Sequence, residues 1–220
     1  MNHISKYRRF MQNSDILSNV ELVSARLLHD LAGSVGAMVN YIECLGDDES
    51  LSEDMMSLLS DAANDVMNKF KLLKQAYSIS DDNGDFSVTK HNIKNYLKRK
   101  KILLEWDVDV QLFDVELVEK INKLLTNIVM ILMYFMINGS KVKVTLSRSS
   151  DDGLLLEIIA CAQKIEIHDS IKCILDRDIS NKELNTKNIH VNFLMMLLDN
   201  YDAKMTYEVQ KTMFKFFVCI

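Results

Sequence analysis

The sequence predicts an α+β protein in which an antiparallel helical hairpin is followed by an α/β sandwich. Apolar residues recur every three or four positions over two long segments, 16–45 and 51–78, joined by a few polar residues. A polar linker with Asn-Gly turn chemistry, 80–85, follows them. Beyond it the pattern order is strand, helix, hairpin, helices and hairpin, which favours a mixed sheet covered on one face by helices.

The first helix is expected to run from about Ile16 to Leu45, after a polar and frayed N-terminal tail over 1–17. Gly46 is a suitable C-terminal stop. The apolar positions form one seam along the helix, as expected for a helix that packs with one face. These positions are Val20, Val23, Leu27, Leu31, Val35, Met38, Ile42 and Leu45.

The second helix is expected over 51–78, because Ser50 and Glu53 match the S-x-x-E capping box. A lone hairpin would leave much of its apolar seam in water, and pairing two hairpins in a four-helix bundle would bury it. We therefore expect residues 18–80 to form a dimerisation hairpin and the protein to be a homodimer. The seam of the second helix comprises Leu51, Met55, Leu58, Ala62, Val66, Phe70, Leu73 and Tyr77.

Residues 81–220 are expected to form the α/β sandwich domain. Its long apolar stretch, 124–137, is shorter than the ~18 residues that span a bilayer, so a buried core helix is the expectation. The turn sequence at 149–153 joins two strand patterns into a hairpin. The expected elements are helices at 88–98, 114–137, 170–175 and 188–201, and strands at 101–110, 141–147, 154–160, 205–210 and 213–219.

Composition excludes several classes of function. The net charge of -5 argues against a nucleic-acid binder that relies on a broad basic field. The basic run 98–101 is expected to be a solvated segment, with a docking patch as the alternative. Neither a signal peptide nor a membrane span is visible in the sequence, which suggests a cytoplasmic protein. The four cysteines lack metal-site spacing and are expected to be buried, reduced thiols.

His29 is the candidate functional residue on the first helix. At 100° per residue, Leu27 and Leu31 each lie about 160° from His29 around the helix, so its imidazole should point away from the seam. Its own stripe runs through Gly33, Gly36 and Asn40.

The two glycines of this stripe, Gly33 and Gly36, each cost roughly 0.5–1 kcal/mol inside a helix relative to alanine. Low side-chain bulk is therefore needed on the face of His29. Two reasons are open: close approach of another protein, or tight packing against the second helix.

An exposed, neutral imidazole can attack a phosphoryl group in line. Asp30 could hold the other ring nitrogen, although neighbouring side chains diverge on a helix. Arg26 could offset the charge of the phosphoryl group. The alternative is an ordinary surface histidine. The remaining histidines are expected to have surface or capping roles; these are His3, His91, His168 and His190.

The segment 26–34, followed by Asn40 and Glu43, resembles the phosphohistidine segment of the ChpT-like histidine phosphotransferases of the alphaproteobacterial cell-cycle phosphorelay. The family layout is also similar: a dimeric hairpin and then a degenerate histidine-kinase ATPase domain. Val35 replaces the proline that follows the serine in the family pattern.

The second half of the chain departs strongly from a working kinase. Asn127 resembles the kinase asparagine, but the residues after it lack polar groups for magnesium and phosphates. The chain has no glycine after Gly153, whereas backbone binding of a triphosphate normally needs a glycine-rich loop. We therefore expect no ATP binding by this chain and a structural role for Asn127.

The resemblance implies that His29 relays a phosphoryl group between receiver domains, assisted by Asp30 and Arg26. It implies a hybrid-kinase receiver and CtrA-like response regulators as partners, which would contact Gly33, Ser34, Gly36 and Asn40. Magnesium would be supplied by the receiver, with no cofactor bound by this chain. The alternatives are a residual histidine kinase and a non-catalytic dimeric scaffold that binds receivers.

Overall fold

The computed structural model describes residues 3–46, 53–77, 85–108, 114–148, 153–178 and 183–220, with the side chains of the first helix from Ile16 to Cys44. The predicted cap at Ser50, most of the linker 80–85 and most of the turn 149–153 lie outside the described residues.

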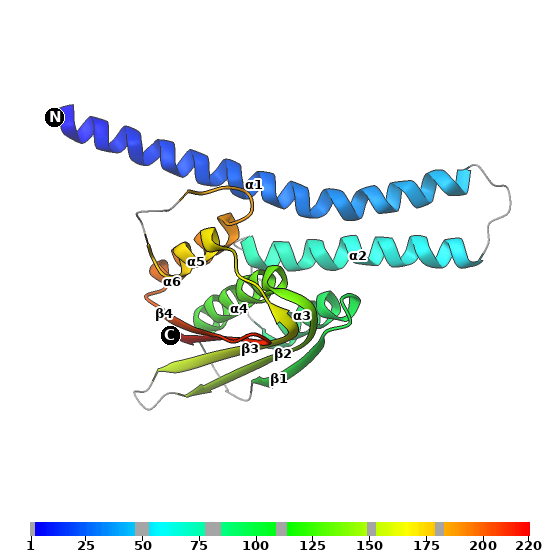
Figure 1. Cartoon of the computed structure of the whole chain (residues 1–220). Coiled ribbons are helices and arrows are strands. Elements are labelled where there is room, and N and C mark those ends of the chain that lie inside the picture. The colour runs from blue at the N-terminus through cyan, green and yellow to red at the C-terminus, as the bar shows by residue number, and fades with distance from the viewer. Residues whose placement is uncertain (1–2, 47–52, 78–84, 109–113, 149–152, 179–182) are drawn as a thin grey trace.

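Two long helices, α1 (His3–Gly46) and α2 (Glu53–Tyr77), form the predicted antiparallel hairpin. The N-terminal part of α1 extends well beyond the C-terminal end of α2 (Figure 1). The expectation of a frayed tail over 1–17 is wrong, because α1 begins at His3. No glycine or proline interrupts residues 3–15, so the helix continues without a breaker.

The second part of the chain is a helix-covered sheet, as the order of patterns predicts. Asp85 and Asp114 cap α3 and α4, their carboxylates accepting hydrogen bonds from N–H groups of the first turn. The elements are α3 (Phe86–Arg99), β1 (Leu103–Val108), α4 (Val115–Phe135), β2 (Met136–Arg148), β3 (Leu154–Ile165), α5 (Asp169–Leu175), α6 (Ile189–Asn200), β4 (Lys204–Val209) and β5 (Met213–Cys219).

The five described strands have the order β1-β2-β3-β5-β4, with β1 parallel to β2 and the other neighbours antiparallel. Helix α4 makes the crossover between the parallel strands. The helices lie between the sheet and the hairpin (Figure 1). The predicted α+β class is therefore confirmed.

The main differences from the predicted boundaries are at the start of β2 and the end of β3. Helix α4 ends at Phe135, and β2 begins at once with Met136, whose backbone is already extended. A register shift at Gly139 and a positive φ at Asn138 interrupt the ladder between β2 and β3. The helical apolar pattern continues unbroken into the strand, so it could not mark this boundary.

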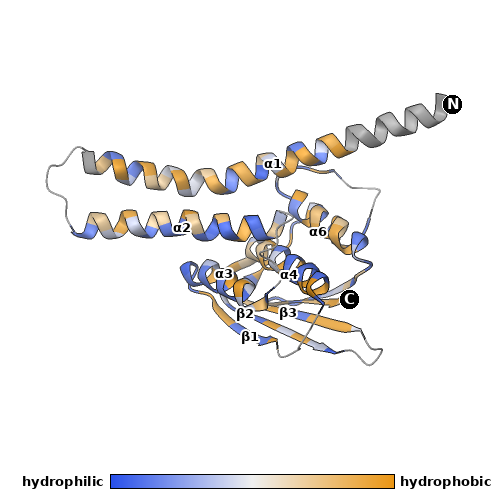
Figure 2. Cartoon of the chain, turned by 180° about the vertical axis from the view of Figure 1, so that it is seen from behind, coloured by the Kyte–Doolittle hydropathy of each residue, from blue (hydrophilic) through white to orange (hydrophobic). Residues whose placement is uncertain are grey.

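Helix α4 is buried along most of its length, which confirms the prediction that its apolar stretch belongs to the core. On the hairpin, Leu27 and Leu31 pack against this core. Other seam positions are uncovered in the single chain: Ile42 on α1 is 50% exposed and Leu58 on α2 is 46% exposed. Hydrophobic positions recur along both helices (Figure 2). An isolated hairpin thus leaves part of its seam in water, as expected.

The expectation of buried thiols is wrong: Cys44 and Cys219 are exposed, and Cys161 and Cys173 are partly buried. All four are free. Cys44 lies on the outward side of α1, and Cys219 ends a strand whose side chains alternate between the core and solvent. Of the helices described, none is long and apolar enough to cross a membrane.

Candidate functional site

His29 presents its imidazole to solvent from the middle of α1, with 78% of the side chain exposed. Gly33, Gly36 and Asn40, predicted on the same stripe, are also exposed. A Cβ atom added to either glycine would meet no described atom within 4 Å outside the helix itself. Tight packing against α2 is therefore not the reason for these glycines, and the stripe is an open surface.

Ser34 does not share this open surface. Its side chain is buried and donates a hydrogen bond to Asp65 Oδ2 at 2.9 Å, while Lys69 donates to its hydroxyl. At 100° per residue Ser34 lies about 140° from His29 around the helix, so it faces α2. Ser34 therefore lies inside the hairpin, in contrast to its predicted place among the partner-binding residues.

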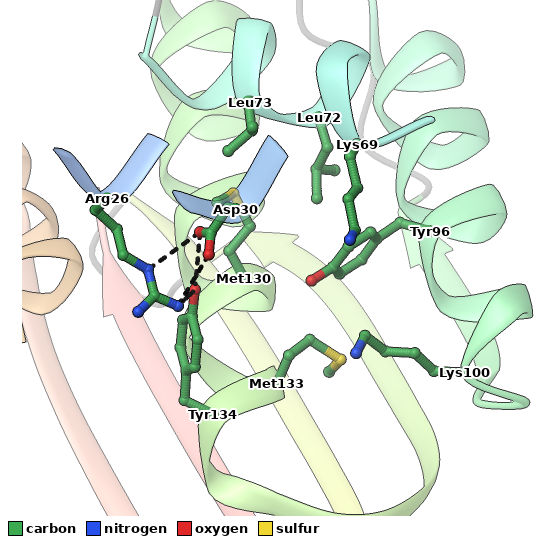
Figure 3. Close-up of a pocket in the computed structure, with 10 residues that line it drawn as sticks. All are labelled: Arg26, Asp30, Lys69, Leu72, Leu73, Tyr96, Lys100, Met130, Met133 and Tyr134. Carbon is green, nitrogen blue, oxygen red and sulfur yellow. Dashed lines mark hydrogen bonds and ion pairs between the residues drawn. The ribbon is translucent and has the colours of Figure 1, made fainter. Parts of the chain in front are cut away.

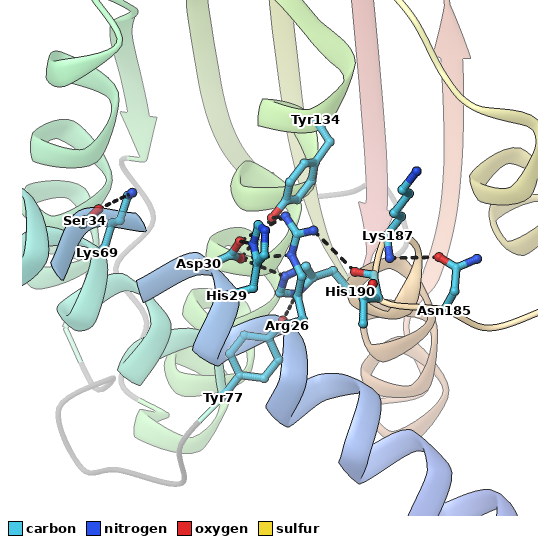
Figure 4. Close-up of polar contacts among 11 residues, drawn as sticks. Arg26, His29, Asp30, Ser34, Lys69, Tyr77, Tyr134, Asn185, Lys187 and His190 are labelled. Atoms are coloured by element: carbon cyan, nitrogen blue, oxygen red, sulfur yellow. Dashed lines mark hydrogen bonds and ion pairs between the residues drawn. The ribbon is translucent and has the colours of Figure 1, made fainter. Parts of the chain in front are cut away.

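Asp30 lies next to the imidazole and is held by Arg26. His29 Nδ1 is 3.5 Å from Asp30 Oδ1, a long but direct approach. One helical turn away, Arg26 donates from Nε to Asp30 Oδ2 at 3.1 Å, and its Nη2 lies 3.1 Å from Oδ1. This two-point ion pair fixes the carboxylate plane and leaves Oδ1 directed toward His29 (Figure 4).

The α/β domain supplies further contacts to the same carboxylate. The Tyr134 hydroxyl donates to Asp30 Oδ2 at 3.2 Å, and His190 Nε2 lies 3.4 Å from that oxygen. The Tyr77 hydroxyl contacts His190 Nδ1. An Nε2–H tautomer of His190 would let it donate to Asp30 and accept from Tyr77. Asp30 is thus shared between the hairpin and the α/β domain (Figure 4).

Arg26 also has several partners in the α/β domain. Its guanidinium lies 4.6 Å from the ring centroid of Tyr134, donates to the Tyr134 hydroxyl, and donates to the Thr186 carbonyl at 3.4 Å. The predicted contact with a phosphoryl group would require Arg26 to leave some of these partners. In this arrangement Arg26 acts on Asp30 and joins α1 to the α/β domain.

The electrostatics of the cluster keep Asp30 ionised. Burial would raise the pKa of Asp30, but the hydrogen bond from His190 and the positive charge of Arg26 outweigh burial and lower it to about 2. Burial, with the charge of Asp30, raises the pKa of Tyr134 to about 12. At neutral pH the carboxylate is therefore an acceptor and the Tyr134 hydroxyl is a donor.

His190 is a member of this cluster that the sequence did not predict. A surface or capping role was expected, but its side chain is almost fully buried at the start of α6. Only the packing of α6 beneath α1 brings it to Asp30. His168 does cap α5, accepting from Ser170 N–H at 3.4 Å, as expected. His91 is an exposed residue of α3, and the side chain of His3 lies outside the described residues.

Asn127 has the structural role that the sequence analysis predicted. It is buried, and its amide donates to the Ala76 carbonyl at 3.1 Å and to the Lys123 carbonyl at 2.8 Å. It thereby ties α4 to the last turn of α2. In the part of the chain that the structure describes, no group of three or more His, Cys, Asp or Glu side chains is arranged to bind a metal ion.

Comparison with known proteins places these features in a family. A family model for the histidine phosphotransferase C-terminal domain matches residues 86–213, more than half of the chain. The chain belongs to the histidine phosphotransferase family. The predicted resemblance of the chain to the ChpT-like histidine phosphotransferases is thereby confirmed. A histidine phosphotransferase of this type acts by phosphoryl transfer in a two-component phosphorelay.

One solved structure supports the fold of this histidine phosphotransferase. A bacterial phosphotransferase matches with a TM-score of 0.77 at 18% identity, covering 92% of this chain and 96% of that chain. The Acinetobacter baumannii histidine kinase AdeS gives a TM-score of 0.48 at 13% identity, with 87% and 96% covered. The histidine kinase domain of the Erythrobacter litoralis EL346 blue-light activated histidine kinase gives 0.48 at 14% identity, with 92% and 93% covered. A search of curated protein sequences returned no match.

Proposed function

We propose that His29 is the phosphoacceptor of this histidine phosphotransferase and relays a phosphoryl group between receiver aspartates. The observation that carries this assignment is the exposed imidazole on a stripe without side-chain bulk, with its second ring nitrogen beside the ionised Asp30. A folded receiver domain needs such an open surface to bring its aspartyl phosphate within reach of the ring.

In the proposed transfer, Nε2 of neutral His29 attacks the phosphorus of the receiver's aspartyl phosphate in line. The N–P bond forms as the P–O bond to the receiver aspartate breaks, and the aspartate leaves as a carboxylate. Asp30 stabilises the Nδ1–H of the ring as positive charge develops on it, since the Oδ1–Nδ1 distance of 3.5 Å needs only a small closure. The reverse step on a second receiver regenerates neutral His29.

The phosphoryl group would come from a partner and not from ATP bound to this chain. The absence of any glycine after Gly153 in the sequence supports this assignment. So does Asn127, whose amide is occupied by the backbone carbonyls of α2 and α4. The magnesium that assists transfer would be held by the acidic pocket of the receiver.

We propose a homodimer through α1 and α2, because the uncovered seam positions would be buried in a four-helix bundle. Each dimer would present two His29 side chains. The resemblance of the segment 26–34 points to a hybrid-kinase receiver upstream and CtrA-like response regulators downstream, in the cytoplasm.

Transfer of label from a phosphorylated receiver to the purified protein tests the phosphoacceptor. Wild type should acquire the label, whereas His29→Ala and His29→Gln should acquire none. His91→Ala is the matched control, because His91 is also exposed but lies on α3. Label that persists in the His29 variants would disprove the assignment. If His29→Ala still binds the receiver and signalling stays intact, the protein would instead be a non-catalytic scaffold.

The origin of the phosphoryl group is tested separately. Radiolabelled ATP with magnesium, without any receiver, should leave the purified protein unlabelled. Label on His29 under these conditions would show a residual histidine kinase.

A further inference from the structure

A cavity of about 270 Å³ lies between the hairpin and the α/β domain, beside Asp30. Four helices contribute to it: α1, α2, α3 and α4 (Figure 3). Its volume is close to the lower end of the roughly 300–1,000 Å³ range of small-molecule sites. A molecule with a single ring and one headgroup is therefore of a suitable size.

Positive charge exceeds negative charge in the lining of this cavity. Arg26 on α1, Lys69 on α2 and Lys100 at the C-terminal cap of α3 line it. Asp30 is its one lining carboxylate among the described residues. Arg26 neutralises Asp30 through their two-point ion pair. Two lysines therefore remain without a carboxylate inside the cavity.

The two lysines, Lys69 and Lys100, differ in the number of polar partners that they have within the protein. Lys69 donates to Ser34 and lies 3.7 Å from Asp65, which Arg99 also contacts at 3.0 Å. Lys100 forms no ion pair with any residue that the structure describes, and its ammonium lies 5.9 Å from the ring centroid of Tyr96. The Lys100 charge is thus available for an anionic group.

The remaining walls are mostly apolar. Leu72 and Met130 are buried, and Met133 is partly buried next to them. Figure 3 shows the Met133 thioether beside Lys100, and the Tyr96 hydroxyl directed into the space between them and Lys69. A hydrated inorganic ion would leave these apolar walls against water, whereas an apolar ring would cover them.

We propose that this cavity binds a small amphipathic anion, in which an apolar ring or short chain carries one phosphate-like or carboxylate group. The headgroup would lie between Lys69 and Lys100, and the apolar part against Met130 and Met133. Such a molecule would bridge the hairpin and the α/β domain next to the residues that hold Asp30. The cavity is distinct from the proposed phosphoacceptor, because His29 points to solvent and does not line it, although Arg26 and Asp30 do.

Methionine-methyl NMR of the full-length protein tests the proposal directly, since two methionines line the cavity. The probe is phenylphosphonate, whose carbon–phosphorus bond prevents phosphoryl transfer to His29. The expected result is a saturable shift of the Met130 and Met133 methyl signals, with the other assigned methionines unchanged. Lys100→Gln should weaken binding about tenfold, as expected for the loss of one charge-assisted hydrogen bond.

The control variant is Lys98→Gln, an exposed lysine of the same basic run that does not line the cavity. It should leave the affinity unchanged. Benzoate distinguishes the headgroups: binding of both probes indicates a site for either anion, and binding of phenylphosphonate alone indicates a phosphate-like headgroup. No saturable shift with either probe, equal binding of inorganic phosphate, or equal weakening by Lys98→Gln and Lys100→Gln would overturn the proposal.

Discussion

His190 Nε2 lies 3.4 Å from Asp30 Oδ2, so a buried histidine of the α/β domain contacts the carboxylate next to the exposed His29. The contact joins α1 to α6, although the two residues are 160 positions apart in the sequence. In the proposed transfer, the α/β domain would therefore help to orient the Asp30 carboxylate, which both Tyr134 and His190 contact.

Replacing His190 by phenylalanine should therefore slow phosphoryl transfer without removing His29. Asp30 would lose a hydrogen bond to a charged acceptor, worth about 1.5–3 kcal/mol, and its pKa should rise. We expect a transfer rate at least tenfold lower, measured with labelled receiver. His190→Gln, which can still donate to Asp30, should recover part of the rate. Equal rates for wild type and His190→Phe would contradict a positioning role.

Tyr134→Phe is a milder test of the same cluster. The substitution removes only the hydroxyl that donates to Asp30 and accepts from Arg26, and leaves the ring beneath the guanidinium. Stability in urea should fall by about 1 kcal/mol, the usual net value of a hydrogen bond. Tyr201→Phe is the control, because Tyr201 lies near Lys120 and away from Asp30. A loss as large in the control would show that the effect is not specific to the cluster.

The sequence could not predict the contacts that hold this cluster together. The periodicity of the hairpin predicted the outward direction of His29, because that direction follows from 100° per residue on one helix. Tyr134 and His190 reach Asp30 from 104 and 160 residues away in the chain. No local pattern encodes such a contact. The predicted boundary between α4 and β2 was also wrong. The residues on both sides of the change from helix to strand, Phe135 and Met136, are equally apolar, so the sequence pattern does not mark it.

The stability of the protein in acid should report the ionisation of Asp30. Its pKa is about 2 in the folded protein, below the value of 3.8 for an unperturbed aspartate, so the unfolded chain binds a proton more readily. The ionised carboxylate thus stabilises the fold above about pH 4, and this contribution is lost as the pH falls toward about 2. Asp30→Asn should cost about 2 kcal/mol at pH 7 in urea unfolding, and the difference from wild type should shrink below pH 4. A difference independent of pH would exclude this origin.

Gly33→Ala should separate folding from receiver docking. The added methyl group meets open space, and alanine favours the helix by roughly 0.5–1 kcal/mol over glycine. Thermal unfolding should therefore show a stabilised protein. If the stripe is the docking surface, transfer from the receiver should become slower with Gly33→Leu, while Ala63→Leu on the exposed side of α2 should leave it unchanged. Unchanged transfer in Gly33→Leu would place the receiver elsewhere.

Ile42→Glu should disrupt the proposed homodimer. Ser34 contacts Asp65 in the antiparallel hairpin, so eight residues further along α1 Ile42 lies nearly level with Leu58 of α2, and both are about half exposed. In a four-helix bundle these side chains would be buried, and a carboxylate among them would be strongly unfavourable. Sedimentation equilibrium should give twice the chain mass of 25.3 kDa for wild type and a single chain for Ile42→Glu. Val88→Glu on α3, which replaces a comparably exposed residue outside the hairpin, should remain dimeric. A monomeric wild type would reject the bundle, and a dimeric Ile42→Glu would show that the subunits associate through another surface.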